Sequence, residues 1–370
     1  MPYVTPGQKN VTYLTRRGCH RTPTTGIVWG DVSDLSWSAA AGQTDRRTDG
    51  HEREQEEQVM PERRTDSPPA TDTGAGDRTG RLTEAFVTHR NLLFTIAYEM
   101  LGSAADAEDV LQETWLRWVG VDFDEVREPR AYLVRITTRQ ALNHLRTLGR
   151  RKESYVGSWL PEPLLTAPDV AEDVELAESV STAMLLVLET LTPTERAVFV
   201  LREVFAVEYD QIAEAVDKTP VAVRQIAHRA RAHVAARRPR ESVSAAQARG
   251  ALEAFKLAVE TGDLQGLLDQ LAPNVVAMGD GGGIKQAVPR PVVGAEKVAR
   301  LFVGGMRKFG ARMSAELVQI NGGPALLTRL DDEIDGILSV RVEDGLVTAF
   351  YYVRNPEKLS RIQQETAMSR

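Results

Sequence analysis

Apolar residues recur at helical intervals from about residue 82 to 236, and in short strand-like runs after that. Phe86, Leu93 and Met100 are seven residues apart, which places them on one face of a helix that ends at Gly102-Ser103. Similar spacing predicts further helices from near residue 104 and from about 129 to 148. The ordered part of the chain therefore begins with an all-helical region.

The helical pattern resumes near Val174 and is expected to continue to about residue 190. Thr192-Pro193-Thr194-Glu195 then predicts a helix start, with Thr192 as the N-cap and Glu195 as the return partner of a capping box. Further helices are expected over residues 197–205, 209–216 and 220–236, followed by a polar hinge at 237–245.

Residues 153–174 lie between the two helical regions and are predicted to form a linker with an apolar anchor. Pro161 and Pro163 exclude a helix around them, because proline lacks the amide hydrogen and restricts the residue before it. The anchor consists of Trp159, Leu160, Pro161, Glu162, Pro163 and Leu164.

The pattern changes at Ala246 to one amphipathic helix, over about 246–261, and then to strand-like runs. Glycine, asparagine and aspartate separate these runs, and a further helix is expected over 295–309. This order predicts an α+β domain with a curved antiparallel sheet. The expected strands are 275–278, 312–320, 325–330, 336–342 and 346–353.

Residues 1–80 show no sustained period, and 43–80 contain almost no aliphatic side chains. Such a segment cannot offset the entropy of ordering by burial. We expect residues 1–80 to be disordered, or to be an extension wrongly included in the reading frame. One hypothesis is that translation starts at Met60.

Composition favours a soluble multidomain protein. The chain has 370 residues and a net charge of −7, which by itself argues against nucleic-acid binding. The single cysteine, Cys19, excludes a disulfide framework and a cysteine-rich zinc site. No apolar run approaches the length of a membrane span, and no signal peptide is recognisable. We expect a cytoplasmic protein with no membrane association, metal or cofactor.

The charge distribution changes that picture. Residues 127–152 hold eight basic residues and one acid, and residues 222–240 hold six arginines and no acid. The segment between them, 153–221, carries three basic and fourteen acidic residues. Because a polyanion responds to the local field within about 10 Å, these two basic segments are candidate nucleic-acid contacts.

The first basic segment forms a cationic stripe if residues 130–150 are helical. Four arginines at spacings of four, seven and four residues fall within an arc of about 60°. Such a stripe suits a phosphate backbone, and nearby Tyr132 and Asn143 could touch bases. A merely solubilising face would normally include glutamates. The stripe consists of Arg135, Arg139, Arg146 and Arg150.

The second basic segment has the layout of a helix-turn-helix, with its turn at 217–219 and its second helix from Pro220. In this motif the first half of the second helix enters the major groove. Arg224 and Gln225 are of the types that recognise guanine and adenine edges. The other candidate DNA contacts on this helix are Val221, His228, Arg229 and Arg231.

An acidic cluster precedes both basic segments. Asp106, Asp109 and Glu113 share one helix face and have no basic neighbour before Arg117. A favourable helix dipole would explain the first two acids but not Glu113. The alternative interpretation is a docking surface for a basic partner.

These motifs resemble the extracytoplasmic-function sigma factors, in the order and spacing of that family. Asp106 to Arg117 resembles the helix that binds core RNA polymerase, Pro129 to Arg146 the helix that melts the promoter and recognises the minus-ten element, and 191–231 the domain that recognises the minus-thirty-five element. The resemblance implies promoter DNA and core polymerase as partners. It implies polymerase contacts at Asp106, Asp109, Gln112, Glu113 and Trp115.

The linker and C-terminal motifs resemble the SigJ-like subgroup, which carries a fused SnoaL-like domain of the nuclear-transport-factor-like cone type. That resemblance implies two all-α sigma domains followed by an α+β domain that regulates them in cis, with no obligatory separate anti-sigma factor. The chain departs from the family at two positions. Ile284 precedes Lys285 where the subgroup has lysine directly after the glycines, and Asp217 stands where many helix-turn-helices have glycine. The turn requires a left-handed residue at 217, which aspartate can supply at some cost. The implied interdomain residues are the six of the anchor with Asp280, Gly281, Gly282, Gly283, Lys285, Asn355, Pro356, Lys358 and Leu359.

The predicted domains are 81–152 (sigma-two), 153–174 (linker), 175–240 (sigma-four), 246–360 (SnoaL-like) and 361–370 (tail). The alternative is a helix-turn-helix regulator whose SnoaL-like domain binds or converts a small molecule. Carboxylates are available for such chemistry, but no histidine follows His233. A ligand in the C-terminal domain stays open, and catalysis is not expected.

Overall fold

The computed structural model describes residues 73–370, except 168–169, 171–172 and 238–243. The hypothesis about Met60 and most of the segment 1–80 lie outside these residues. Helix α1 (Thr73–Leu101) begins before the predicted boundary at residue 81, which is a correction: residues 73–80 are helical. Among the described residues, no helix has both the length and the apolar character that crossing a membrane requires.

The first helical domain packs α1 against α2 (Ala104–Trp118) and α3 (Pro129–Glu153), with a short turn η1 (Phe123–Glu125) between the last two. Ser103 caps α2 by accepting from the Asp106 amide at 3.2 Å. The predicted helices are confirmed, although α3 continues five residues beyond the expected end at 148.

The second helical domain comprises α5 (Val174–Val180), α6 (Thr182–Leu188), α7 (Pro193–Phe199), the π-helical turn η2 (Val200–Val204), α8 (Tyr209–Val216) and α9 (Pro220–Ala235). The helical pattern expected over 174–190 is confirmed and is divided into two helices, because Ser181 has extended backbone and caps α6 with its hydroxyl. The capping box of Thr192 and Glu195 is confirmed. So is the left-handed turn residue Asp217, with φ 54°.

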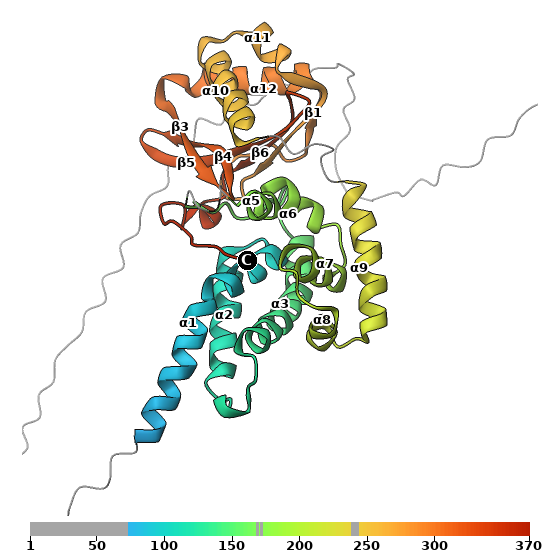
Figure 1. The fold of residues 1–370 in the computed structure, drawn as a ribbon. Helices are drawn as coiled ribbons and strands as arrows, with labels where there is room; N and C mark the ends of the chain where they lie inside the picture. The colour runs from blue at the N-terminus through green and yellow to red at the C-terminus, as the bar shows by residue number, and fades with distance from the viewer. Residues whose placement is uncertain (1–72, 168–169, 171–172, 238–243) are drawn as a thin grey trace, which may run out of the picture. The chain divides into compact units, whose positions relative to one another are not determined.

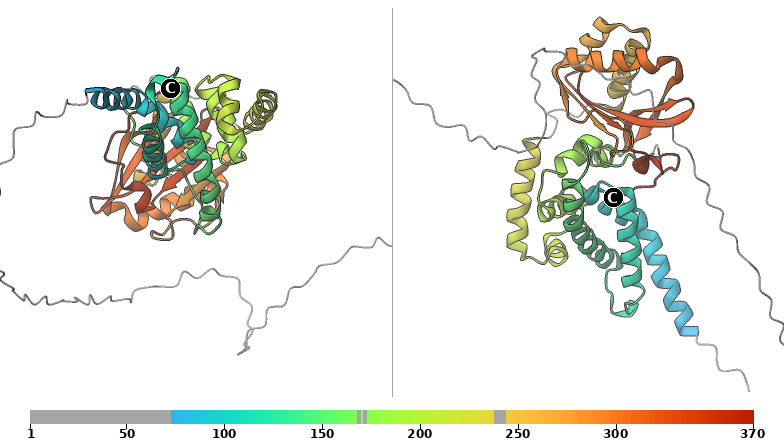
Figure 2. Two further views of the ribbon diagram at one scale, coloured as in Figure 1. Left: turned by 90° about the horizontal axis from the view of Figure 1, so that it is seen from below. Right: turned by 180° about the vertical axis from the view of Figure 1, so that it is seen from behind.

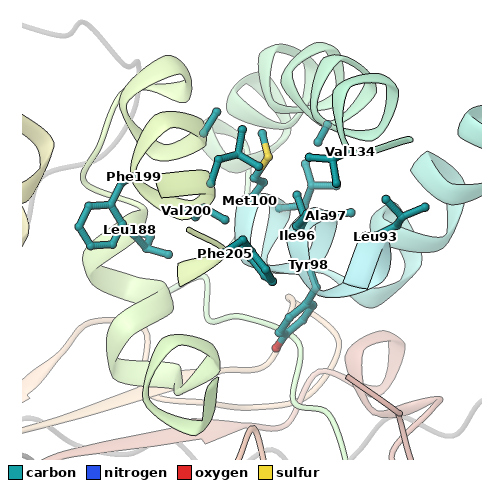
Figure 3. Packing of buried hydrophobic residues seen from close by; sticks show 14 of the residues in the cluster. Leu93, Ile96, Ala97, Tyr98, Met100, Val134, Leu188, Phe199, Val200 and Phe205 are labelled. Carbon is teal, nitrogen blue, oxygen red and sulfur yellow. The ribbon is translucent and has the colours of Figure 1, made fainter. Parts of the chain in front are cut away.

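One apolar core runs through both helical domains. Leu93, Ile96 and Met100 of α1 belong to the same buried cluster as Leu188 of α6 and Phe199 of α7 (Figure 3). The two domains are therefore held together by shared burial in this arrangement.

The C-terminal domain begins with α10 (Ala245–Thr261) and α11 (Leu264–Asp269) and contains α12 (Ala295–Phe309) and the short turns η3 (Gly310–Arg312) and η4 (Pro356–Leu359). Its sheet has the order β2-β1-β6-β5-β4-β3. The strands are β1 (Leu271–Asp280), β2 (Val292–Val293), β3 (Met313–Ile320), β4 (Gly323–Leu330), β5 (Glu333–Glu343) and β6 (Leu346–Val353).

The expected antiparallel sheet needs one correction, because β1 pairs with β6 in parallel. Strands β3 to β6 follow one another through tight turns and are antiparallel. No tight turn joins β1 to β6, so their relative direction is not constrained in that way.

The two faces of the sheet have different partners. The helices α10 and α12 cover one face (Figures 1 and 2), where Phe255, Phe302 and Phe350 pack with ring centroids 4.8–4.9 Å apart. The other face packs around Leu160, which comes from the linker. Strand β6 serves both, since Phe350 lies on the helix face and Tyr351 on the linker face.

The predicted tail is packed rather than free. The Thr366 amide donates to the Leu165 carbonyl at 2.8 Å, and the Ser369 amide to Thr95 Oγ1 at 3.2 Å. Met368 is buried in the core of the helical domains. The last ten residues therefore join the C-terminal domain to α1.

A buried acid on α1 faces the second helical domain. Glu99 has no exposed surface, and one of its oxygens accepts from Ser179 Oγ of α5 at 2.7 Å. The other carboxyl oxygen has no partner among the described residues. Burial raises the pKa of Glu99 to about 8, against a weaker lowering by Ser179, so the neutral form fits this site.

We predict that Glu99→Gln stabilises the fold increasingly as the pH rises. The pKa of Glu99 is about 8 when folded and about 4.5 ordinarily, so unfolding releases a proton between these values and wild-type stability falls across that window. Glutamine cannot ionise and avoids this loss. The check is urea unfolding from pH 5 to pH 8, with exposed Glu84→Gln of the same helix as control. A pH-independent difference between Glu99→Gln and wild type would contradict the prediction.

Candidate functional site

The acidic face of α2 exposes some of its predicted residues and turns others inward. Asp109 and Gln112 are exposed, whereas Asp106 and Glu113 are half-buried. Glu113 lies 3.3 Å from His144 Nε2 of α3. The accessible acidic surface is therefore narrower than the helical spacing predicted.

Trp115 and its neighbour Leu116 differ from the expectation. Trp115 is half-buried, with its ring centroid 5.1 Å from that of Phe86. Leu116 is 70% exposed. Leu116 therefore adds apolar surface beside exposed Gln112, and sequence reasoning missed it because its helical spacing resembles that of core positions.

Two arginines of the predicted stripe on α3 are held by the second helical domain. Arg135 Nη1 donates to Glu214 Oε2 at 2.8 Å, and Arg139 Nη2 donates to the Glu214 backbone carbonyl at 2.7 Å. Arg135 also lies over the Tyr132 ring, 4.6 Å from its centroid. The stripe and the helix-turn-helix therefore face each other through Glu214, which sequence reasoning did not single out.

The rest of the stripe is more open. Arg146 and Asn143 are exposed, and Arg146 Nη1 lies 3.2 Å from Asn143 Oδ1. Arg150 belongs to α3, but its side chain lies outside the described residues.

Helix α9 presents its predicted polar face to solvent. Arg224, Gln225, His228 and Arg229 are exposed, and Val221 is 62% exposed near the helix start. Val223, Ile226, Ala227 and Ala230 are buried and form the apolar face of this helix.

Three arginines of α9 have neighbours that orient them. Arg224 lies 5.5 Å from the centroid of the Tyr209 ring. Arg231 donates to both oxygens of Glu203, at 3.1 and 2.8 Å, and Arg229 lies 3.9 Å from Glu195. Exposed contacts of this kind are weak and can exchange for phosphate.

The linker tryptophan lies close to two lysines. The ring centroid of Trp159 is 3.5 Å from Lys152 Nζ of α3 and 4.4 Å from Lys358 Nζ of the C-terminal domain. Both are cation–π distances. Burial lowers the pKa of Lys152 to about 8, although Glu189 at 2.6 Å acts in the opposite direction.

Glu189 links Lys152 to the core of the helical domains. It accepts from Arg196 Nη1 at 2.8 Å, and Arg196, which is 3% exposed, also donates to the Met100 and Leu188 carbonyls. Burial alone would raise the pKa of Glu189, but Arg196 and Lys152 together hold it below its ordinary value. Sequence reasoning missed Lys152, Glu189 and Arg196, because a buried charge resembles a surface charge in a sequence.

Asp280, at the end of β1, accepts four hydrogen bonds and has no exposed surface. One oxygen accepts from Lys358 Nζ at 2.7 Å and the Leu160 amide at 2.9 Å. The other accepts from Tyr155 Oη at 2.6 Å and the Gly282 amide at 3.0 Å. Hydrogen-bond donors from the linker and from the C-terminal domain thus meet at one carboxylate.

The glycines after Asp280 are required by space. A Cβ at Gly281 would overlap the Lys285 carbonyl, and one at Gly282 would overlap the Asn355 side chain. Gly282 also has φ +63°, which favours glycine. The run forms a tight turn that presents an amide to Asp280.

The Asn355 segment also meets the linker. Asn355 Nδ2 donates to Tyr155 Oη at 2.8 Å, and its amide oxygen accepts from the Glu357 amide at 3.1 Å. Pro356 begins the short turn η4, and Leu359 is buried on the linker face of the sheet.

The interdomain role predicted for Lys285 needs a correction. In the described part of the chain its ammonium contacts the Ile334 carbonyl and Asp335, at 3.2 and 3.4 Å, rather than the linker. Residue 285 closes the glycine turn with its amide, so its side chain is directed along the C-terminal domain.

Most anchor residues of the linker are buried, and one of them, Glu162, makes a polar contact. Glu162 Oε2 accepts from the Ala104 amide at 2.8 Å, so a linker carboxylate caps the start of α2. Leu160, Pro161, Pro163 and Leu164 are all buried.

Aromatic side chains pack on the helix face of the C-terminal sheet, where the three phenylalanines described above contact one another. The buried Asp335 carboxylate is held by Arg354 at 2.7 and 2.9 Å and by Tyr352 Oη at 2.8 Å. The described residues contain no group of three or more His, Cys, Asp or Glu arranged to hold a metal ion.

We predict that Asp280 and Lys358 are strongly coupled. Asp280→Asn or Lys358→Met alone leaves a buried charge unpaired and costs about 3 kcal/mol of unfolding free energy. The double variant costs less than the sum of the two singles by at least about 1 kcal/mol. Urea unfolding measures both quantities, with Asp331→Asn in the exposed Arg312–Asp331 pair as control. Additive losses would rule out the coupling.

Comparisons with known proteins agree with this geometry. Residues 85–151 match the family described as Sigma-70 region 2, and residues 181–234 match Sigma-70, region 4. The chain is 34% identical over 288 residues to the ECF RNA polymerase sigma factor SigJ of Mycobacterium tuberculosis, covering 74% of this chain and 92% of that protein. It is 32% identical to the probable ECF RNA polymerase sigma factor SigI of the same species, over 76% and 96% of the two chains.

The solved structures include a similar protein. The crystal structure of Mycobacterium tuberculosis SigJ matches with a TM-score of 0.63 and 32% identity, covering 76% of this chain and 99% of that one. The match includes the helical domains and the C-terminal α+β domain, which is of the SnoaL-like type. The chain therefore belongs to the extracytoplasmic-function family of RNA polymerase sigma factors.

Proposed function

We propose that the structure represents a closed state of this sigma factor, in which the C-terminal domain holds the two promoter-binding domains against each other. Arg135 and Arg139, both predicted to contact promoter DNA, are engaged by Glu214 of the helix-turn-helix. This is the observation that carries the proposal. A phosphate and Glu214 would compete for the same guanidinium groups.

The C-terminal domain supports this state through buried and partly buried contacts. Asp280, Lys358, Trp159, Lys152 and Glu189 form a continuous chain from the C-terminal sheet to the second helical domain. Such contacts within one chain act at millimolar effective concentration, so a separate anti-sigma protein is not needed to maintain them. We propose regulation in cis, with the C-terminal domain acting as a binding module and not as an enzyme.

Two observations in the C-terminal domain support this role. Its three phenylalanines pack against one another, and the Asp335 carboxylate is already paired with Arg354. The opposite face of the sheet is the one that contacts the linker.

We further propose that core polymerase docks on α2 at Asp109, Gln112 and Leu116. The two polar side chains give orientation, and Leu116 gives apolar area. Trp115 supports this surface from behind through its contact with Phe86. Asp106 and Glu113 lie at the edges of the same face.

Promoter opening needs a place for an unstacked base. An open surface cavity of about 620 Å³ lies between α1, η1 and the start of α3, lined by Arg81, His89, Phe123, Arg127 and Arg130 among others. Burial, and then Arg130, lowers the pKa of His89. Cationic groups around an aromatic ring suit single-stranded DNA, and we propose this cavity as the capture site.

We predict that Leu116→Ala weakens binding to core RNA polymerase at least fivefold, on the order of 1 kcal/mol, because it removes an exposed apolar contact. Native-gel or fluorescence titration with purified core enzyme measures the affinity. Val293→Ala, also an exposed apolar residue but in β2 of the C-terminal domain, serves as control and should leave the affinity unchanged. Equal effects of the two substitutions would exclude this docking surface.

We predict that Glu214→Gln strengthens DNA binding by the free protein about two- to fivefold, because an exposed ion pair contributes roughly 0.2–1 kcal/mol. Fluorescence anisotropy with a short DNA duplex at low and physiological salt measures the affinity. Glu208→Gln is the matched control: it removes the same charge beside the same helix, but its partner is Arg202 at 3.6 Å. If both variants bind DNA equally, the gain reflects net charge and the closed-state proposal fails.

A further inference from the structure

The turn between β3 and β4 of the C-terminal domain is buried, although turns at hairpin tips normally lie in solvent. Asn321 has φ 52° and Gly322 φ 71°, the left-handed pair that Asn-Gly supplies in tight hairpins. Asn321 is only 2% exposed. The tip is therefore inserted into another part of the molecule.

The Asn321 side chain makes three hydrogen bonds to three different segments. Its Nδ2 donates to Tyr98 Oη of α1 at 2.6 Å and to the Val180 carbonyl of α5 at 2.8 Å. Its Oδ1 accepts from the Leu164 amide of the linker at 2.7 Å. Both amide hydrogens are used, which a carboxylate could not reproduce.

Gly322 allows this close approach. Its amide donates to Thr166 Oγ1 at 3.0 Å, and a Cβ at this position would lie 2.5 Å from Ala177 Cα of α5. The linker also runs beside β3, since the Thr166 amide donates to the Gln319 carbonyl at 3.1 Å. The edge strand of the sheet is thereby covered by the linker.

A second step connects the turn to the start of α2. Tyr98 Oη, which accepts from Asn321, donates to the Glu162 carbonyl at 2.6 Å. The Glu162 carboxylate in turn caps α2 at the Ala104 amide. A short hydrogen-bonded path thus leads from the hairpin tip to the helix assigned above to polymerase docking.

We propose that the Asn321–Gly322 turn is a latch, by which the C-terminal domain fixes the first helical domain relative to the second. The latch binds α1, the linker and α5 at once, so it is made only when these three segments are together. It rests on the proposed cis regulation and names an interdomain contact that is separate from the Asp280 cluster. Its hydrogen bonds join uncharged groups, so salt has little effect on it.

The same chain contains a matched hairpin that is not docked. Asp344 and Gly345, between β5 and β6, have φ 51° and 76°. Asp344 is exposed, and a Cβ at Gly345 would meet nothing within 4 Å. Substitutions in both turns therefore distinguish the effect of changing a turn residue from the effect of losing the contacts of the docked turn.

The test uses full-length Asn321→Asp, with Asp344→Asn as control, in a Cys19→Ser background. Spin labels on cysteines at exposed Glu125 and Ala236 report the distance between the two helical domains. Asn321→Asp removes two donors and sets a carboxylate against the Val180 carbonyl, so the distances should lengthen and broaden. Asp344→Asn should leave them unchanged. If Asn321→Asp fails to fold, Thr166→Val, which removes one hydroxyl, replaces it.

Identical distance distributions in Asn321→Asp and Asp344→Asn would overturn the latch, whatever the transcription output. Run-off transcription with core polymerase on the same variants tests the proposed cis regulation separately. Longer distances with unchanged output would support the latch and refute regulation through it. Gly322→Ala against Gly345→Ala gives an independent pair, because both strain the backbone and only the first meets α5.

Discussion

The burial of one carboxylate, Asp280, organises the contact between the C-terminal domain and the rest of the protein. A charge with no exposed surface is tolerated only when its oxygens are saturated with hydrogen bonds and a countercharge is adjacent. Its donors come from the linker, the glycine turn and Lys358. Pulling the domains apart would expose or unpair this group, so the closed arrangement is set by a desolvation requirement as much as by apolar packing.

From Asp280 the same logic extends into the helical domains. Lys358 and Lys152 both lie at cation–π distance from the Trp159 ring, and Glu189 and Arg196 carry the alternation of charge to the end of α1. Removing one partner from these partly buried links costs more than breaking the exposed pair of Arg135 with Glu214, which lies where promoter DNA is proposed to bind. The protein thus combines a firm attachment through the C-terminal domain with a weak, exchangeable contact at the DNA-binding surface. That combination suits a factor whose promoter surfaces must be released without unfolding.

The two faces of the C-terminal sheet have separate packing partners. Three phenylalanines pack on its helix face, while its other face receives Leu160 and the buried hairpin tip. Because side chains alternate between the two faces along β6, Phe350 packs on the helix face and Tyr351 on the linker face. Stability and interdomain binding are therefore separated onto the two sides of one sheet.

Most of the helices, the capping box at Thr192, the left-handed Asp217 and the helix-turn-helix were predictable from the sequence, because periodicity and capping are local properties. The interdomain role of Asp280 and Lys358 was suggested only by resemblance, and their pairing was not predictable. The tertiary structure alone decided that Glu214 meets Arg135, that buried Arg196 pairs with half-buried Glu189, that β1 runs parallel to β6, and that Asn321 is a docked turn while Asp344 is not. The reason is physical: local sequence sets which backbone conformations are favourable, whereas burial of a charge or an amide depends on which distant segment supplies its partner.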